Sequence, residues 1–218
     1  MPTLPLVVEI KLDGWHLFSA QLDLCGGAEV ELRDLRREVS AEVPKRLDSA
    51  TLASHPPLAA LRKLFRAAGC DPTRYRPSSE ALLRRLTQGA EIPEIHPLVD
   101  MSNCLSAELA VPCCVMSDGT FTPPMCFRAG IAGEAYESLR GPFSAEGKPL
   151  LVDSDGPCDT PITGSERVKV TANTERAWLV AYLPKGVVSV DVAAEKLSEL
   201  LRRAPVATVR SESVPDRL

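Results

Sequence analysis

Thiol and imidazole side chains are the groups in this sequence best suited to covalent or metal chemistry, but their spacing indicates neither. The three histidines are dispersed, and Cys113 and Cys114 are adjacent rather than spaced as in a zinc-binding C-x-x-C pair. No glycine motif for binding phosphate occurs. We therefore expect no metal and no cofactor. The cysteines are odd in number and scattered, which is a poor disulfide framework and favours a reducing cytoplasm; they are Cys25, Cys70, Cys104, Cys113, Cys114, Cys126 and Cys158.

Positive charge is concentrated between residues 62 and 85. These residues carry seven cations against Asp71 and Glu80, whereas the whole chain has a net charge of −4. The acidic balance argues against a general nucleic-acid coat and against DNA as a partner, because non-specific binding needs many phosphate-neutralising cations. The basic run is either a pair of solvated helix faces or a local basic surface, and its members are Arg62, Lys63, Arg66, Arg74, Arg76, Arg84 and Arg85.

A central stretch of the sequence is similar to a known family. Residues 74–112, RYRPSSEALLRRLTQGAEIPEIHPLVDMSNCLSAELAVP, resemble the tRNA-editing B3/B4 module of the phenylalanyl-tRNA synthetase beta subunit, and especially small stand-alone proteins built from it. The module's helix reads approximately Asn-x-Val-Val-Asp-Val-Thr-Asn and precedes Leu-Gly-Gln-Pro; residues 96–103 and 109–112 occupy those places. Residues 161–184 resemble its closing Gly-rich turn and strand pair. The resemblance covers about residues 55–200, and the chain has no room for the aminoacylation core.

The resemblance implies an editing site that hydrolyses the ester of a mischarged tRNA. The family's Thr-Asn pair falls on Ser102 and Asn103, which would position the ester or the attacking water. The family's pocket histidine falls on Cys114, so a positioned base is missing. Its pocket glutamate falls on Val180, which implies an amino acid smaller or less polar than tyrosine. The substrate-binding positions carried over are Thr163, Gly164, Ser165 and Val180.

Two of these assignments leave alternatives open. Cys114 is a nucleophile if its thiol pKa is depressed, and otherwise one of the two adjacent cysteines is simply part of the core. Ser102 and Asn103 belong either to the pocket or to the cap of their helix. An aminoacyl ester is already activated, so these side chains, backbone amides near Gly164 and an ordered water would be sufficient for hydrolysis.

The function that the resemblance implies is a cytoplasmic, stand-alone editing factor that acts in trans. Its partner would be the acceptor end of an aminoacyl-tRNA, contacted by the basic run, with a synthetase as a second partner. The first alternative is a non-catalytic module that binds tRNA ends or amino acids. The second is a hydrolase of another small ester or amide.

The elements that must position these residues are predicted from hydrophobic periodicity. Helices are expected at 29–46, from Pro56 to Gly69, after a cap at Ser78 or Ser79, from 97 to about 110, and at 190–203. His55 and His96 are expected to cap the helices that they precede. Strands are expected at 113–117, 121–128, 149–153, 166–171 and 177–183, with a hairpin over 5–24 that turns at Asp13-Gly14.

The pattern is that of a mixed α/β protein, and the resemblance implies a three-layer B3/B4-like domain with a mixed or antiparallel sheet flanked by helices. We expect N-terminal strands and a helix packed on the core (1–54), the editing domain (55–204), and a C-terminal strand with a frayed tail (205–218). The chain is 44% hydrophobic, which is ample for a core. No apolar run approaches the roughly 20 residues that cross a bilayer, and no signal peptide is expected.

Overall fold

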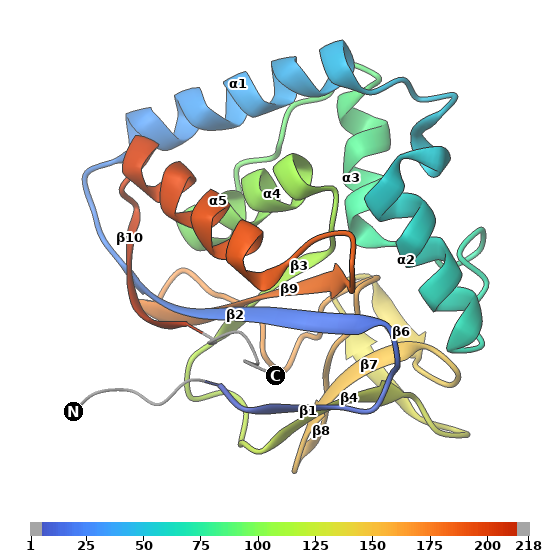
Figure 1. The fold of residues 1–218 in the computed structure, drawn as a ribbon. Coiled ribbons are helices and arrows are strands. Elements are labelled where there is room, and N and C mark those ends of the chain that lie inside the picture. The colour runs from blue at the N-terminus through green and yellow to red at the C-terminus, as the bar shows by residue number, and fades with distance from the viewer. Residues whose placement is uncertain (1–5, 213–218) are drawn as a thin grey trace.

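Helices, a first β-sheet and a second β-sheet form three successive layers in the computed structural model, which describes residues 6–212 (Figure 1). The first sheet is antiparallel, in the order β10 (Ala207–Glu212), β2 (Trp15–Leu24), β9 (Arg176–Pro184) and β3 (Cys113–Ser117). The second sheet is mixed, in the order β1 (Val8–Ile10), β4 (Met125–Ala129), β7 (Pro149–Asp153) and β8 (Gly156–Asp159). A hairpin of β5 (Ala135–Ser138) and β6 (Gly141–Ser144) lies beside them.

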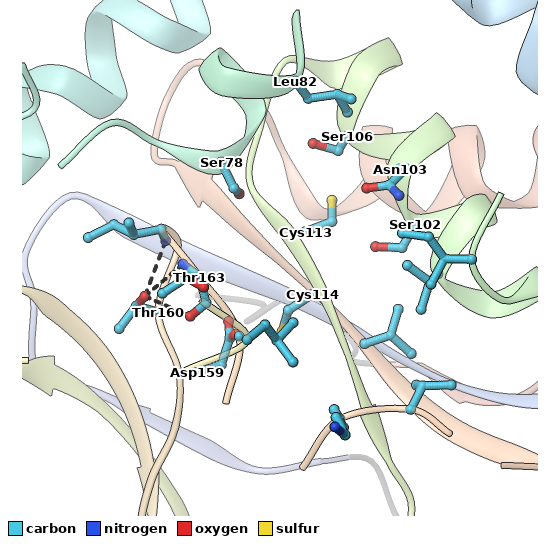
Figure 2. A pocket seen from close by; sticks show the side chains of 18 of the residues that line it. Ser78, Leu82, Ser102, Asn103, Ser106, Cys113, Cys114, Asp159, Thr160 and Thr163 are labelled. Carbon is cyan, nitrogen blue, oxygen red and sulfur yellow. Dashed lines mark hydrogen bonds between the residues drawn. The ribbon is translucent and has the colours of Figure 1, made fainter. Parts of the chain in front are cut away.

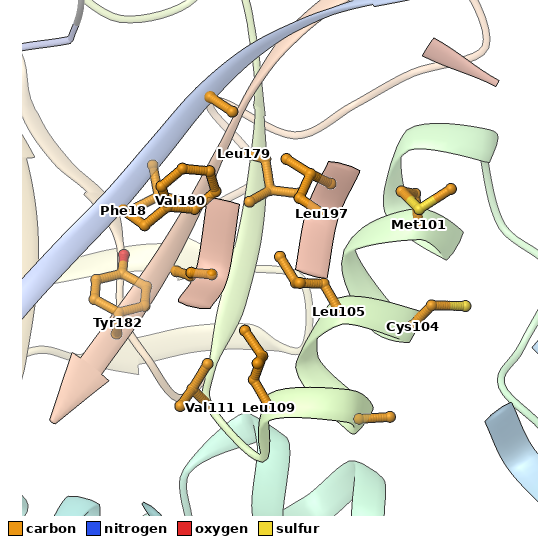
Figure 3. Close-up of a cluster of buried hydrophobic side chains, with 14 of the residues drawn as sticks. Phe18, Met101, Cys104, Leu105, Leu109, Val111, Leu179, Val180, Tyr182 and Leu197 are labelled. Atoms are coloured by element: carbon orange, nitrogen blue, oxygen red, sulfur yellow. The ribbon is translucent and has the colours of Figure 1, made fainter. Parts of the chain in front are cut away.

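The helices lie where their apolar periodicity predicts them, although the second ends at Ala67, before Gly69, and the third already begins at Ser78. They are α1 (Glu29–Arg46), α2 (Pro56–Ala67), α3 (Ser78–Leu86), α4 (Pro97–Leu109) and α5 (Val190–Arg203), with a 3₁₀ turn at Leu52–Ser54. Leu105 and Leu109 of α4 face β9 and the buried side of α5, where Leu197 lies (Figure 3). Burying one such leucine side chain contributes about 1.5–3 kcal/mol. The apolar stripe therefore determines which face of α4 packs in the core and which face carries the polar side chains.

An aromatic cluster joins the two sheets. The ring of Phe127 on β4 lies 5.3 Å from that of Trp15 on β2 and 5.2 Å from that of Tyr182 on β9. All three side chains are buried. The mixed α/β class and the layered, B3/B4-like arrangement predicted above are confirmed.

The predicted hairpin over residues 5–24 is wrong. β1 pairs in parallel with β4 in the second sheet, whereas β2 lies in the first sheet between β9 and β10. Both edges of β2 are therefore already paired, and β1 can find backbone partners only elsewhere. The turn itself is present, with Gly14 at a φ of +81°, a conformation that glycine adopts without steric cost.

The predicted strand at 166–171 is also absent. The carbonyl of Val168 accepts a bond from Ser117 N–H at the end of β3, and the Arg167 side chain turns away to pair with Asp153. The segment thus touches the edge of β3 at one point without forming a ladder. This divergence matters because a cavity lies between the two segments.

The predicted caps have mixed outcomes. His96 Nδ1 accepts the Leu98 N–H at 3.2 Å, which confirms a capping role. His55 makes no such bond at the start of α2. Ser78 and Ser79 lie inside α3, whose N-cap is Pro77, so neither serine caps it. Pro77 restricts the backbone where the chain enters this helix. The N–H group of Ser78, which has no partner within the helix, donates to the Pro161 carbonyl.

One hydrophobic core runs through all three predicted segments, from Leu6 to Ala207. The segment boundaries at 54 and 204 remain predictions, and the predicted frayed tail falls on 213–218, outside the described residues. Within residues 6–212, no helix is both long and apolar enough to cross a membrane.

Candidate functional site

A cavity of about 550 Å³ opens at the free edge of β3, within the size range of small-molecule sites. The walls of the cavity come from α3, α4, β3, and the segments 159–165 and 168–170. Because β3 pairs with β9 along one edge only and residues 168–170 diverge from the other, space is left between them. Figure 2 shows polar side chains from several of these segments around this space.

The α4 wall carries Ser102 and Asn103. Both lie well inside the helix, which begins at Pro97, so the capping alternative for them is wrong. Ser102 Oγ and the Asn103 amide form no side-chain hydrogen bond to any described residue, and both side chains point from α4 into the cavity (Figure 2). Ser102 is only 3% exposed, so its hydroxyl faces the cavity rather than the outer surface. Polar groups that line a cavity without a protein partner are available to a ligand or to water. By contrast, Ser106 Oγ on the same wall donates to the Val111 carbonyl at 2.7 Å.

A buried ion pair holds α4 in place. Asp100 accepts the backbone N–H groups of Ile95 and His96, and Arg36 of α1 lies 3.5 Å from its other oxygen. Burial raises the pKa of Asp100, while the two N–H bonds and Arg36 act against that shift. This network ties the first turn of α4 to α1, so Ser102 and Asn103 sit on a fixed element rather than on a loop.

The opposite wall is a turn between β8 and the segment that follows it. Thr163 N–H donates to Thr160 Oγ1 at 3.0 Å, and the Thr163 carbonyl accepts the Tyr136 hydroxyl at 2.7 Å. Gly164 lies so close to neighbouring atoms that an added Cβ would be 3.2 Å from Leu139 Cδ1. The structure therefore brings Thr163, Gly164 and Ser165 to the same cavity as Ser102 and Asn103.

Val180 does not reach this cavity. It is fully buried on β9, paired in register with Cys114, and its side chain belongs to the core (Figure 3). The strand pairing places it one strand away from the open edge of β3. A role for Val180 in contacting substrate is therefore not supported by its position.

Cys113 and Cys114 line the cavity from β3, with side chains on opposite sides of the strand (Figure 2). Burial raises the pKa of both thiols. For Cys114 the carboxyl group of Asp159 adds to the rise, against a smaller effect of the Tyr182 hydroxyl 3.8 Å away. A nucleophilic thiolate needs the opposite shift, so the surroundings of Cys114 favour a neutral thiol.

Asp159 is the acidic group of the cavity, and the sequence prediction missed it. It ends β8, is 1% exposed, and accepts the Tyr182 hydroxyl on Oδ2 at 2.5 Å. Burial raises the pKa of Asp159 to about 7, although hydrogen bonds from Tyr182, Cys114 and the Thr160 N–H each lower it. In the sequence Asp159 is a single acid in a segment for which no strand was predicted, so neither its position nor its burial was visible.

The members of the basic run have three kinds of surroundings, and Arg76 has two of them. Arg62, Arg76 and Arg84 all pair with the buried carboxylate of Glu80. Lys63 and Arg66 are exposed but lie on neither wall of the cavity. Arg85 lines the cavity, while Arg74 and Arg76 line a second hollow of about 280 Å³ beside it.

Arg140 lines both hollows, and the sequence prediction missed this residue as well. It lies in the turn of the β5–β6 hairpin, where an isolated arginine gives no helical or strand pattern to notice. Thr163 and Ile162 are also shared by the two hollows. The two hollows therefore adjoin at Arg140, and the second one extends to the ring of Tyr75, over which Arg74 lies at 5.1 Å. Among residues 6–212, no cluster of three or more histidine, cysteine or acidic side chains is arranged to hold a metal ion.

These features define a mixed α/β domain with a polar cavity between a helical wall and the open edge of a sheet. The chain belongs to the B3/4 domain family, whose model matches residues 60–200. This match confirms the resemblance found at residues 74–112. Among solved structures, an N-terminal fragment of the phenylalanyl-tRNA synthetase beta subunit from Pyrococcus horikoshii is similar, with 14% identity and a TM-score of 0.49 over 93% of this chain. This chain covers 50% of that structure. No curated protein gives a significant match.

Proposed function

We propose that this protein is a cytoplasmic editing factor that hydrolyses the ester of a mischarged aminoacyl-tRNA in trans. The observation that carries the proposal is the convergence of Ser102 and Asn103 on the turn at Thr163–Ser165, with neither side chain hydrogen-bonded to a described residue. Family membership and the motif resemblance support the same reading. The size of the cavity suits an aminoacyl group together with part of the terminal nucleoside.

The proposed chemistry needs only positioning and hydrogen bonding. The Asn103 amide donates to the ester carbonyl oxygen and to the oxyanion that develops on it, and Ser102 orients the attacking water. Fixed donors of this kind stabilise the transition state because they need no reorganisation during the reaction. The raised thiol pKa of Cys114 favours attack by water over a covalent acyl-enzyme. The aliphatic lining, including Val115, Val168 and Val170, favours a small or apolar amino acid.

The proposal is tested by deacylation of a panel of radiolabelled, correctly charged and mischarged aminoacyl-tRNAs with the purified protein. Selective release from one mischarged pair supports the proposal and identifies the substrate. Tight binding of tRNA ends or amino acids with no hydrolysis across the panel would replace it with the binding-module alternative. Hydrolysis of model esters but no aminoacyl-tRNA would indicate a small-ester hydrolase instead.

The cations at the cavity mouth give a further prediction. We expect the double variant Arg85→Glu, Arg140→Glu to bind aminoacyl-tRNA at least about tenfold more weakly at physiological salt, because two phosphate contacts are lost. The slope of log K against log salt should fall by about 1.5. Fluorescence anisotropy between 50 and 200 mM salt, with the tRNA carrying a dye, measures both quantities.

A matched control carries the same change of charge away from the cavity. Lys63→Glu, Arg66→Glu alters two exposed cations of the same basic run that line neither hollow. We expect a much smaller loss of affinity in this control. Equal losses in the two double variants would show that net charge, rather than the surface at the cavity mouth, governs binding.

A further inference from the structure

Asp159 is a buried acid with an unusual set of neighbours. Its Oδ2 accepts the Tyr182 hydroxyl at 2.5 Å, and the Cys114 thiol lies 3.8 Å from that same hydroxyl. Despite being sealed from bulk solvent, its side chain lines the cavity opposite the α4 wall (Figure 2). Structural buried carboxylates normally pair with a cation. In this same domain Asp153, on β7, pairs in that way with Arg167.

The groups that face Asp159 are all neutral acids. They are Tyr182 from β9, Cys114 from β3 and Tyr136 from β5, and burial raises the pKa of each. With the pKa values of its neighbours raised and its own near 7, Asp159 is the first of these groups to ionise as the pH rises. The cluster therefore holds a carboxylate that can take up a proton near neutral pH, and no cation among residues 6–212 forms an ion pair with it.

We infer that Asp159 is the general base of the hydrolytic reaction and that Tyr182 is its positioning residue. The inference rests on the proposed function and supplies the base that the sequence lacks at the family's histidine position. Asp159 lies across the cavity from Ser102 and Asn103, so a water between the two walls can meet an ester carbonyl held by Asn103. A base whose pKa lies near the working pH is largely ionised and still accepts a proton readily, which is the combination that general-base catalysis needs.

Asp159 removes a proton from water while the water oxygen bonds to the ester carbonyl carbon, and the carbonyl oxygen becomes an oxyanion. Collapse of this tetrahedral intermediate breaks the bond to the ribose oxygen, which takes the proton from Asp159. The released amino acid leaves as a carboxylate after losing one proton to solvent, and Asp159 is again ionised.

Glycine at position 164 fits this arrangement. An added Cβ there would lie 3.4 Å from Asp159 Oδ1, the oxygen that Tyr182 does not occupy, and 3.2 Å from Leu139 Cδ1. The missing side chain therefore leaves room beside the proposed reactive oxygen. Tyr182 holds the other oxygen and fixes the plane of the carboxylate.

The test measures kcat, KM and the pH profile of deacylation between about pH 5.5 and 8. For Asp159→Asn we expect kcat to fall about 10²- to 10⁴-fold, the usual contribution of a general base, with KM nearly unchanged. In the wild-type protein, kcat should rise with pH through about 7, because the ionised form is the active one. This acid limb should disappear in Asp159→Asn.

Tyr182→Phe provides a second test that survives if Asp159→Asn fails to fold. The Tyr182 hydrogen bond lowers the pKa of Asp159, so its loss should move the acid limb to higher pH while the plateau rate changes little. Tyr136→Phe is the control for the midpoint alone, since the Tyr136 hydroxyl bonds Thr160 and Thr163 rather than Asp159. Its rate can fall because the turn at Thr163 loses a bond, but the midpoint of the acid limb should stay near that of the wild-type protein. A purely structural role of Tyr182 would not move the midpoint of the profile.

The outcomes separate this inference from the proposed function. Wild-type activity on a mischarged tRNA with an equally active Asp159→Asn variant overturns the base assignment alone. A raised KM with unchanged kcat overturns it in favour of Asp159 binding the substrate ammonium group. Hydrolysis of amino-acid methyl esters that depends on Asp159, without activity on any aminoacyl-tRNA, supports the base and overturns the editing function. No hydrolysis of any ester overturns both.

Discussion

Asn103→Ala is expected to lower kcat for aminoacyl-tRNA deacylation by about 10²- to 10³-fold. The amide of Asn103 points into the cavity and has no hydrogen bond to a described residue. Removal of one preformed oxyanion donor typically costs that factor, because the developing charge is left without its partner. Single-turnover deacylation of the substrate identified in the panel measures the effect.

Ser106→Ala is the matched control for this prediction. Ser106 lies one turn further along α4 on the same wall, but its hydroxyl donates to the Val111 carbonyl just after the helix. We expect a stability loss of about 1 kcal/mol and a nearly normal kcat. Comparable losses of kcat in both variants, with equal thermal midpoints, would mean that the α4 wall supports the cavity without Asn103 acting on the ester.

Glu80→Ala is expected to lower the free energy of unfolding by about 3 kcal/mol. The Glu80 carboxylate is fully buried and accepts bonds from Arg62 at 2.9 Å and Arg84 at 3.0 Å, with Arg76 3.4 Å away. Removal of one partner from a buried ion pair leaves the others uncompensated, which typically costs 3–5 kcal/mol. The value expected here is at the low end because the arginines keep part of their contact with water. Urea denaturation followed by circular dichroism measures it.

Arg76→Ala is the control for the Glu80 prediction. Its side chain is 41% exposed and is the most distant of the three partners, and exposed ion pairs contribute at most about 1 kcal/mol. The two variants should therefore differ by at least about 2 kcal/mol. If Glu80→Ala were as mild as Arg76→Ala, the carboxylate would not be what joins α2 to α3.

This ion-pair cluster also changes how the basic run is understood. From the sequence, Arg76 and Arg84 stand four residues on either side of Glu80, which is the spacing of helical pairs. Sequence spacing gives no sign that Arg62 reaches Glu80 from a neighbouring helix, or that the carboxylate is buried. Three of the seven cations therefore stabilise the fold, and the cations left at the cavity mouth include Arg140, which lies outside the run.

The sequence by itself determined the local elements and the family. Apolar residues at helical spacing set the bounds of α1 and α5, and the motif at residues 96–103 placed Ser102 and Asn103 on one helix. Helix formation depends on residues that are close together in the sequence, so the spacing of apolar residues reveals it without knowledge of the tertiary structure. His96 capping α4 is predicted for the same reason.

Only the tertiary structure decided the pairing of distant strands and the chemistry that this pairing creates. β1 joins β4 rather than β2 because both edges of β2 are occupied by strands from the end of the chain. Asp159 and Tyr182 meet because the end of β8, in the second sheet, lies beside β9 in the first. Burial then moves the pKa of Asp159 toward neutrality, and burial is a property of the assembled layers that no local pattern of residues specifies.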